Sequence, residues 1–140
     1  MSAPWEGEPD RVEFTAHGLP CLVLRGPVGA LNGYVGLPPG HKYHGAGYES
    51  VPAEVHGGLT YGEHQSRRID LGDGFWVLGF DCAHAGDAWP GSPEHDGWTY
   101  KNVAYVRAEV ESLAAQLSVA SDVASTVPEE YMSDGPWVVS

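Results

Sequence analysis

Three side chains able to bind a metal or move a proton lie within seven residues, directly after an apolar run. They are Asp81, His84 and Asp87, and the apolar run covers residues 75–78. Such a run predicts a strand. A polar loop at the end of a strand is a common position for functional side chains, so we expect a site in the segment 79–87.

An imidazole with similar surroundings lies upstream. His56 is followed by Gly57 and Gly58 and then by a second short run typical of a strand. Glycines allow the backbone to approach a neighbour or a ligand closely. We therefore expect His56 to converge in space with the side chains at positions 81, 84 and 87, forming one polar pocket.

The four side chains of this pocket suit a divalent metal. Imidazole and carboxylate ligands favour Zn²⁺, Mn²⁺ or Fe²⁺, and four candidates are enough for three protein bonds and a water. A metal would lower the pKa of its bound water, as metal-assisted hydrolysis requires. The spacing is not that of a known metal motif such as His-Glu-x-x-His. The candidate metal ligands are His56, Asp81, His84 and Asp87.

The same atoms also support a site without metal. His56 or His84 would then be a general base, oriented by Asp81 or Asp87. The backbone amides of Gly57 and Gly58 would bind an anion. The candidate catalytic residues are His56, Asp81 and His84, and the tyrosines available to stack on a ligand's ring are Tyr43, Tyr48 and Tyr61.

Each of these residues also has an ordinary structural explanation. The carboxylates of Asp81 and Asp87 would accept backbone N–H bonds in a glycine-rich loop, and the two histidines would be buried imidazoles bonded to carboxylates. Cys82, beside His84, adds a thiolate nucleophile as a further alternative, although buried free cysteines commonly behave as small apolar residues.

Four segments resemble a family of small uncharacterised bacteriophage and prophage proteins. The resemblance covers roughly residues 20–118. It implies a phage context, either as an accessory enzyme or as a protein that interferes with a host system, and it implies no particular reaction. The segments are Tyr34-Val35-Gly36-Leu37-Pro38-Pro39-Gly40-His41, Val55-His56-Gly57-Gly58-Leu59-Thr60, Gly79-Phe80-Asp81-Cys82-Ala83-His84-Ala85-Gly86-Asp87 and Tyr105-Val106-Arg107-Ala108-Glu109.

Composition narrows the class of protein and of partner. A chain of 140 residues with 42% hydrophobic residues fits one globular domain. The net charge of −12 opposes binding to a phosphate backbone, so we expect no nucleic-acid partner. The alternative to a small-molecule or metal site is a non-catalytic acidic protein that binds and inhibits a host protein or sequesters a nucleotide signal.

The elements that must position the site are short strands followed by one helix. We expect strands at 12–16, 21–25 and 34–37, the last returning through a turn at Asn32-Gly33, and a hairpin of 67–71 with 75–81. Residues 48–50 suit a helical turn. Trp76, Leu78 and Phe80 alternate with Val77, which predicts a strand buried on both faces.

Apolar residues recur at spacings of three and four over 103–117 and predict a helix, which Thr99 or Asn102 would cap. We therefore predict an α+β fold: an antiparallel or mixed sheet with one principal C-terminal helix packed on it. Residues 1–10 would be a mobile acidic arm, 11–120 the domain and 121–140 a C-terminal tail.

The chain shows no secretory signal and no apolar run long enough for a membrane helix. We expect a cytoplasmic protein without a membrane partner, in which Cys21 and Cys82 are reduced thiols.

Overall fold

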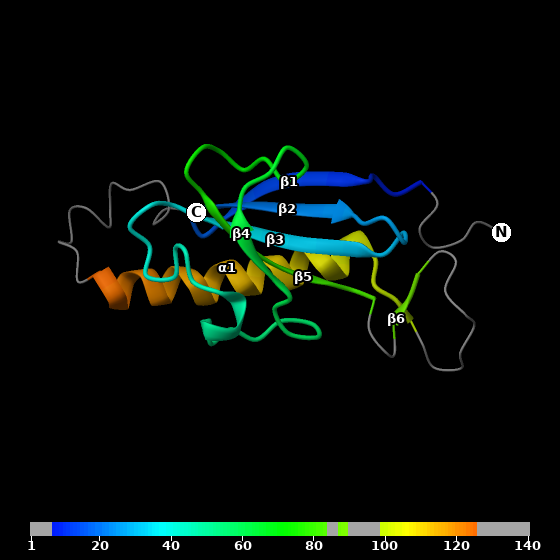
Figure 1. Ribbon diagram of the computed structural model, residues 1–140. Coiled ribbons are helices and arrows are strands. Elements are labelled where there is room, and N and C mark those ends of the chain that lie inside the picture. Colours follow the sequence, from blue (N-terminus) through cyan, green and yellow to red (C-terminus); the bar gives the residue numbers. More distant parts are fainter. Residues whose placement is uncertain (1–6, 84–86, 90–98, 126–140) are drawn as a thin grey trace.

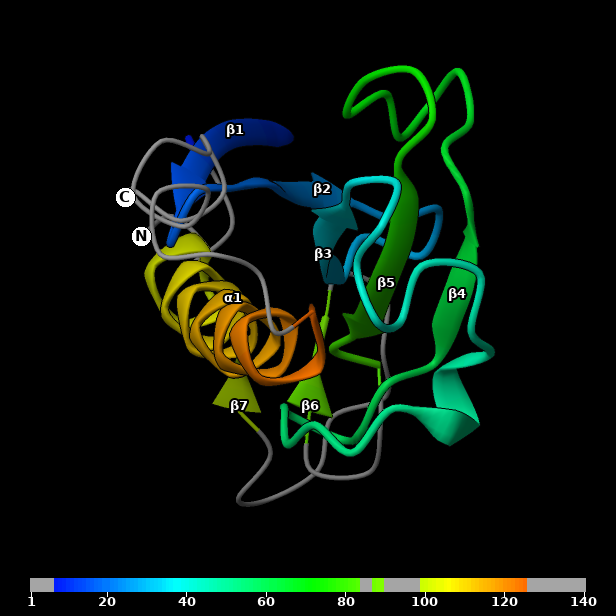
Figure 2. The same ribbon diagram turned by 90° about the vertical axis from the view of Figure 1, so that its left-hand side faces the viewer.

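A five-stranded antiparallel sheet carries one long helix across one face (Figure 1). The computed structural model describes residues 7–83, 87–89 and 99–125. The strand order is β1-β2-β3-β5-β4, and each neighbouring pair is antiparallel. Figure 2 looks along the helix and shows it lying on one side of the sheet. The α+β class with one principal helix is confirmed.

The sheet strands are β1 (Arg11–Ala16), β2 (Leu19–Arg25), β3 (Leu31–Leu37), β4 (Tyr61–His64) and β5 (Trp76–Asp81). A separate pair of short parallel strands, β6 (Asp87–Ala88) and β7 (Thr99–Tyr100), leads into the helix α1 (Val103–Ser125). The helical turn expected at 48–50 is the 3₁₀ helix η1 (Tyr48–Ser50).

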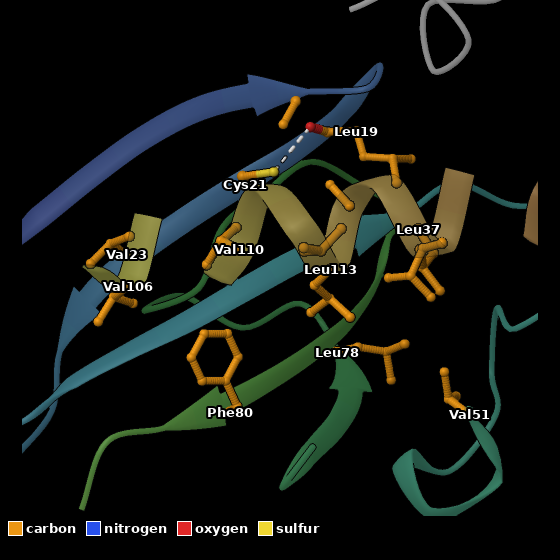
Figure 3. Close-up of a cluster of buried hydrophobic side chains, with 14 of the residues drawn as sticks. Leu19, Cys21, Val23, Leu37, Val51, Leu78, Phe80, Val106, Val110 and Leu113 are labelled. Atoms are coloured by element: carbon orange, nitrogen blue, oxygen red, sulfur yellow. Dashed lines mark hydrogen bonds between the residues drawn. The ribbon is translucent and has the colours of Figure 1, made fainter. Parts of the chain in front are cut away.

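The main core lies between α1 and the sheet. Val110 and Leu113 of the helix are fully buried and pack in one cluster with Leu78 and Phe80 of β5 (Figure 3). Full burial of a side chain of this size stabilises the fold by about 1.5–3 kcal/mol. The helix predicted from the spacing of these residues is therefore held mainly by its apolar stripe.

A second, smaller core covers the other face of the sheet. It joins Leu22 and Leu24 of β2, Tyr34 of β3 and Val77 of β5 to Ile69 from the loop after β4. Val77 and Leu78 are adjacent in sequence and belong to different cores. This confirms the prediction that β5 is buried on both faces.

The prediction of a turn at Asn32-Gly33 is wrong. Both residues lie inside β3, and the β2–β3 connection is instead closed by the N–H of Gly26, which donates to the carbonyl of Ala30 at 2.8 Å. A Cβ atom on Gly33 would lie 2.5 Å from Cγ2 of Val110. The glycine is required for close approach of the helix and not for a turn.

The hairpin predicted from residues 67–71 and 75–81 is also wrong. The partner of β5 at this edge is β4, in which Tyr61 pairs with Gly79 and His64 with Trp76. Residues 67–71 form no strand; they belong to a loop whose Ile69 fills the second core. β4 lies at the edge of the sheet, where a strand can be polar. Its sequence therefore lacks the apolar alternation by which a strand is recognised.

The two ends of the predicted domain also differ from expectation. The helix continues to Ser125, past the boundary expected at residue 120, and Asn102 caps its start by accepting the N–H of Tyr105 at 2.8 Å. Glu8, placed in the expected mobile arm, accepts the hydroxyl of Tyr100 at 2.6 Å and the N–H of Val103 at 2.9 Å. Residues 126–140, the rest of the expected tail, lie outside the described residues.

No helix in the described part of the chain has a stretch both apolar and long enough to cross a membrane.

Candidate functional site

A tight turn before β4 presents His56. Gly57 and Gly58 have φ angles of 70° and 83°, and the N–H of Gly58 donates to the carbonyl of Val55 at 2.9 Å. Glycine adopts such angles at little cost, which explains the two glycines after the histidine. The backbone N–H of His56 donates to Oε1 of Glu109 at 2.7 Å, so the turn is fastened to α1.

The imidazole of His56 is bonded at both ring nitrogens. Nε2 lies 2.8 and 2.9 Å from the two carboxylate oxygens of Asp87, and Nδ1 lies 2.9 Å from the hydroxyl of Tyr105. The rings of His56 and Tyr105 meet edge to face, with their centroids 5.5 Å apart. Asp87 comes from β6 and Tyr105 from α1, so three segments distant in the sequence meet here.

Asp87 is a buried carboxylate that contacts both His56 and the ammonium group of Lys101. Its side chain is 2% exposed, and Nζ of Lys101 lies 3.1 Å from its Oδ1. The parallel pairing of β6 with β7 sets Asp87 opposite Thr99, which brings Lys101 within reach. We refer to His56, Asp87, Lys101, Tyr105 and Glu109 as the His56 cluster.

The partners of His56 fix its tautomer. A carboxylate paired with an ammonium group is ionised and only accepts hydrogen bonds. In a neutral imidazole, Nε2 of His56 then carries the proton and donates a hydrogen bond to Asp87, which leaves Nδ1 with a lone pair. The hydroxyl of Tyr105 then donates to Nδ1. The result is a chain of two hydrogen bonds, from Tyr105 through His56 to Asp87.

Asp81 lies on the other face of the sheet. Its side chain follows Val77 and Gly79 in the alternation of β5, and its Oδ1 accepts the N–H of Ala83 at 3.0 Å. The hydroxyl of Thr60 lies 3.3 Å from Oδ2. With side chains of β3 and β4, Asp81 lines a cavity of about 230 Å³. The sequence correctly pairs His56 with Asp87, whereas α1, which supplies Tyr105, covers the face opposite Asp81.

The residues predicted to contact a ligand have separate roles. The N–H of Gly58 is used within the turn, so it is not a donor for an anion. Tyr61 packs edge to face on Tyr34, with ring centroids 5.5 Å apart, beside the cavity of Asp81. Tyr48 lies in η1 and is 38% exposed.

The described residues do not form the predicted metal site. No group of three histidine, cysteine, aspartate or glutamate side chains among them is arranged to hold a metal ion. Both ring nitrogens of His56 are hydrogen-bonded, so a metal would have to replace Asp87 or Tyr105. His84, the remaining candidate ligand and catalytic residue, lies outside the described residues.

Both cysteines are buried free thiols, as expected. Burial raises the pKa of Cys82 to about 12, and the carboxylates of Asp87 and Asp81 add to the effect. Burial likewise raises the pKa of Cys21 to about 12. Thiols with such pKa values stay protonated at neutral pH, which opposes the alternative of a Cys82 thiolate nucleophile.

Three members of the His56 cluster were not among the predicted site residues. Lys101 reaches Asp87 only because β7 pairs with β6, a long-range contact without a local signal. Tyr105 and Glu109 did carry one: they are four residues apart, so they share a side of the helix.

Comparison with known proteins adds no assignment: no family model, no curated protein and no solved structure matches this chain.

Proposed function

We propose that the protein binds a small molecule at the His56 cluster and transfers a proton there, with His56 as a general base that Asp87 orients. The observation that supports this most directly is the pair of bonds on the imidazole. Nε2 is bonded to a buried carboxylate 2.8 Å away, and Nδ1 is bonded to the hydroxyl of Tyr105, a residue that is 38% exposed. A histidine whose tautomer is fixed in this way is suited to accept a proton.

The geometry favours the metal-free form of the site. His56 has no ring nitrogen left for a metal while Asp87 and Tyr105 are bonded to it. The buried charge of Asp87 is balanced by Lys101 at 3.1 Å. Metal-assisted hydrolysis through His84 stays a prediction, and adding a chelator to the binding experiment tests it.

The resemblance to phage and prophage proteins gives the proposal a biological setting. We place the protein among phage accessory proteins that act in the cytoplasm of the infected cell, where reduced thiols such as Cys21 and Cys82 are usual.

A melting screen tests the proposal. The ligands would be nucleotides, aryl esters, thioesters and divalent metals, with and without EDTA. A ligand that binds the native state at about 100 times its Kd stabilises it by about 2.7 kcal/mol, so the melting temperature should rise. We expect the rise to be lost in His56→Asn and kept in the matched variant His17→Asn, whose histidine is exposed in the β1–β2 turn.

Two results would contradict the proposal. One is a melting shift of equal size in both histidine variants, since the ligand would then bind elsewhere. The other is no shift with any ligand, together with capture of one host protein at equal strength by the parent and by His56→Asn. That outcome would favour the alternative of an acidic protein that inhibits a host partner.

A further inference from the structure

Tyr105 is the most exposed end of the hydrogen-bond chain in the His56 cluster. The residue is 38% exposed, whereas the side chain of His56 is 17% exposed and that of Asp87 only 2%. A molecule arriving from solvent therefore reaches the side chain of Tyr105 more readily than that of His56 or Asp87. The phenol oxygen lies 2.9 Å from Nδ1 of His56, to which it donates when the imidazole is neutral with its proton on Nε2.

The three groups of this hydrogen-bond chain follow the order of a nucleophile, a general base and a carboxylate that orients the base. In such triads the hydroxyl attacks, the imidazole takes its proton, and the carboxylate holds the imidazole in the required tautomer. Here the three positions are filled by Tyr105, His56 and Asp87. Nζ of Lys101 lies 5.8 Å from the centre of the Tyr105 ring, where a cation stabilises negative charge developing on the phenol.

We propose that the hydroxyl of Tyr105 is the nucleophile of the His56 cluster and that it accepts an acyl group from an activated ester. The inference rests on the proposed function, because it requires His56 to act as the base.

Charge at the cluster favours a carbonyl centre over a phosphate. The carboxylates of Glu109 and Asp87 both lie close enough to Tyr105 to disfavour its ionised form, and the whole chain carries a net charge of −12. An anionic phosphate ester would be repelled by this field, while a neutral ester or thioester would not. Burial also raises the pKa of Tyr105 above its ordinary value, so a free phenolate is scarce at neutral pH and the base is needed.

The leaving group narrows the substrate class further. Transfer of an acyl group to a phenol is favourable only when the group displaced leaves at least as readily as a phenolate. A thiol has an ordinary pKa of about 8.5 against about 10 for tyrosine, so thioesters meet this condition, as do aryl esters. Simple alkyl esters do not.

The reaction balances in two steps. First, the oxygen of Tyr105 bonds to the acyl carbon, its proton moves to Nδ1 of His56, and the bond to the leaving group breaks. The same proton passes from Nδ1 to the leaving thiolate or phenolate. Water then attacks the acyl-tyrosine, gives a proton through His56 to the oxygen of Tyr105, and releases a carboxylic acid.

The chain offers an internal control for Tyr105. Tyr48 is also 38% exposed, and among the described residues its hydroxyl has no hydrogen-bond partner. An aryl sulfonyl fluoride reports nucleophilic tyrosines, because the phenol oxygen bonds to sulfur as fluoride leaves. We expect Tyr105 to be labelled at least about tenfold faster than Tyr48 near neutral pH, since a general base contributes roughly 100-fold or more. Peptide mass spectrometry measures both rates in one sample.

Two variants test whether Tyr105 is labelled because His56 activates it or only because it is exposed. His56→Asn removes the base, and Asp87→Asn offers an amide N–H to Nε2, which reverses the tautomer and deprives Tyr105 of its acceptor. In each, labelling of Tyr105 should fall to the rate of Tyr48, while the rate at Tyr48 stays unchanged and reports an intact fold. Equal labelling of the two tyrosines in the parent protein would overturn the inference without needing either variant.

The substrate class has its own test. Incubation with p-nitrophenyl acetate should give a burst of p-nitrophenolate and an acetyl group on Tyr105, and p-nitrophenyl phosphate should give neither. Turnover of the phosphate instead would overturn the acyl assignment. Ligand shifts that depend on His56, combined with an unreactive Tyr105, would remove this inference and leave the proposed binding function in place.

Discussion

Two histidines fasten loops to the same helix, and they do so in different ways. His41, after β3, is 6% exposed; its Nδ1 accepts the N–H of Tyr43 at 3.0 Å, and its Nε2 donates to the carbonyl of Leu117 at 2.9 Å. His56 is bonded instead to the side chains of Asp87 and Tyr105.

The difference lies in what the partners can do. A carbonyl and an amide of the backbone hold a fixed hydrogen-bond pattern and neither gains nor loses a proton. A carboxylate and a phenol can do both, and the phenol of Tyr105 is open to solvent. The buried imidazole of His41, with its backbone partners, therefore indicates a structural role. The ionisable partners of His56 indicate a role in proton transfer.

The largest expected effect comes from removing the support that both histidines share. Val110→Asp places a charge without a partner in the core between α1 and the sheet, where Val110 is fully buried. We expect a loss of about 4 kcal/mol or more in the free energy of unfolding, measured by urea titration. The control is Val28→Asp, at a residue that is 54% exposed, where less than about 0.5 kcal/mol should be lost. A matching loss in both variants would contradict the placement of the helix.

The second prediction compares the histidines directly. His41→Asn should lower the free energy of unfolding by about 2 kcal/mol, because it leaves the carbonyl of Leu117 and the N–H of Tyr43 buried without partners. His56→Asn should cost less stability and lower the labelling rate of Tyr105 to that of Tyr48. If His56→Asn lost more free energy of unfolding than His41→Asn in the same titration, the structural role given to His41 would be wrong.

A smaller effect should appear in the pH dependence of stability. Burial lowers the pKa of His41 below its ordinary value. As the pH falls below about 6.5, the unfolded chain binds a proton at this residue and the folded chain does not. The contribution of His41 is therefore complete above that pH and is lost as the pH falls toward its folded pKa. Urea titrations above and below about pH 6.5 should show a lower free energy of unfolding at the lower pH, and this difference should be smaller in His41→Asn. An equal difference in His41→Asn would show that His41 does not cause it.

The smallest effect concerns the turn that presents His56. Gly58 has a φ of 83°, and a Cβ atom added there would meet nothing within 4 Å. Gly58→Ala should therefore cost only the backbone strain of that conformation, about 1 kcal/mol in the free energy of unfolding. Ligand shifts should persist in this variant once its lower baseline stability is taken into account. A complete loss of ligand binding with unchanged stability would instead assign Gly58 to the binding surface.

The spacing of apolar residues predicted the elements correctly where a residue type has only one structural role. The alternation of Trp76, Val77 and Leu78 predicted a strand buried on both faces, and the stripe through Val110 predicted the helix. The pattern misled at Asn32-Gly33, because a glycine serves equally in a turn and under a close-packed helix. It indicated a short strand after Gly58 but not the extent of β4 to His64 or its pairing with β5, because the residues of β4 are too polar to show alternation.

The candidate site was predictable only in part, for a related reason. His56 and Asp87 are reactive types beside glycines, which marks them in sequence. Their geometry depends on Lys101 and Tyr105, brought near by the pairing of β6 with β7 and by the start of α1. Such contacts join residues up to 49 positions apart, and no short window of sequence contains both partners.

The bond between Glu8 and the start of α1 has a consequence for how the chain assembles during synthesis. It joins positions separated by 95 residues, so the first turn of the helix emerges from the ribosome long after the carboxylate that completes its capping. The strands β1, β2 and β3 are available by residue 37, yet the helix that packs on their apolar side begins only at Val103. A sheet formed in that interval would leave Val23 and Val35 without the helix that buries them, and such an apolar surface is where a chaperone would bind or an aggregate would begin.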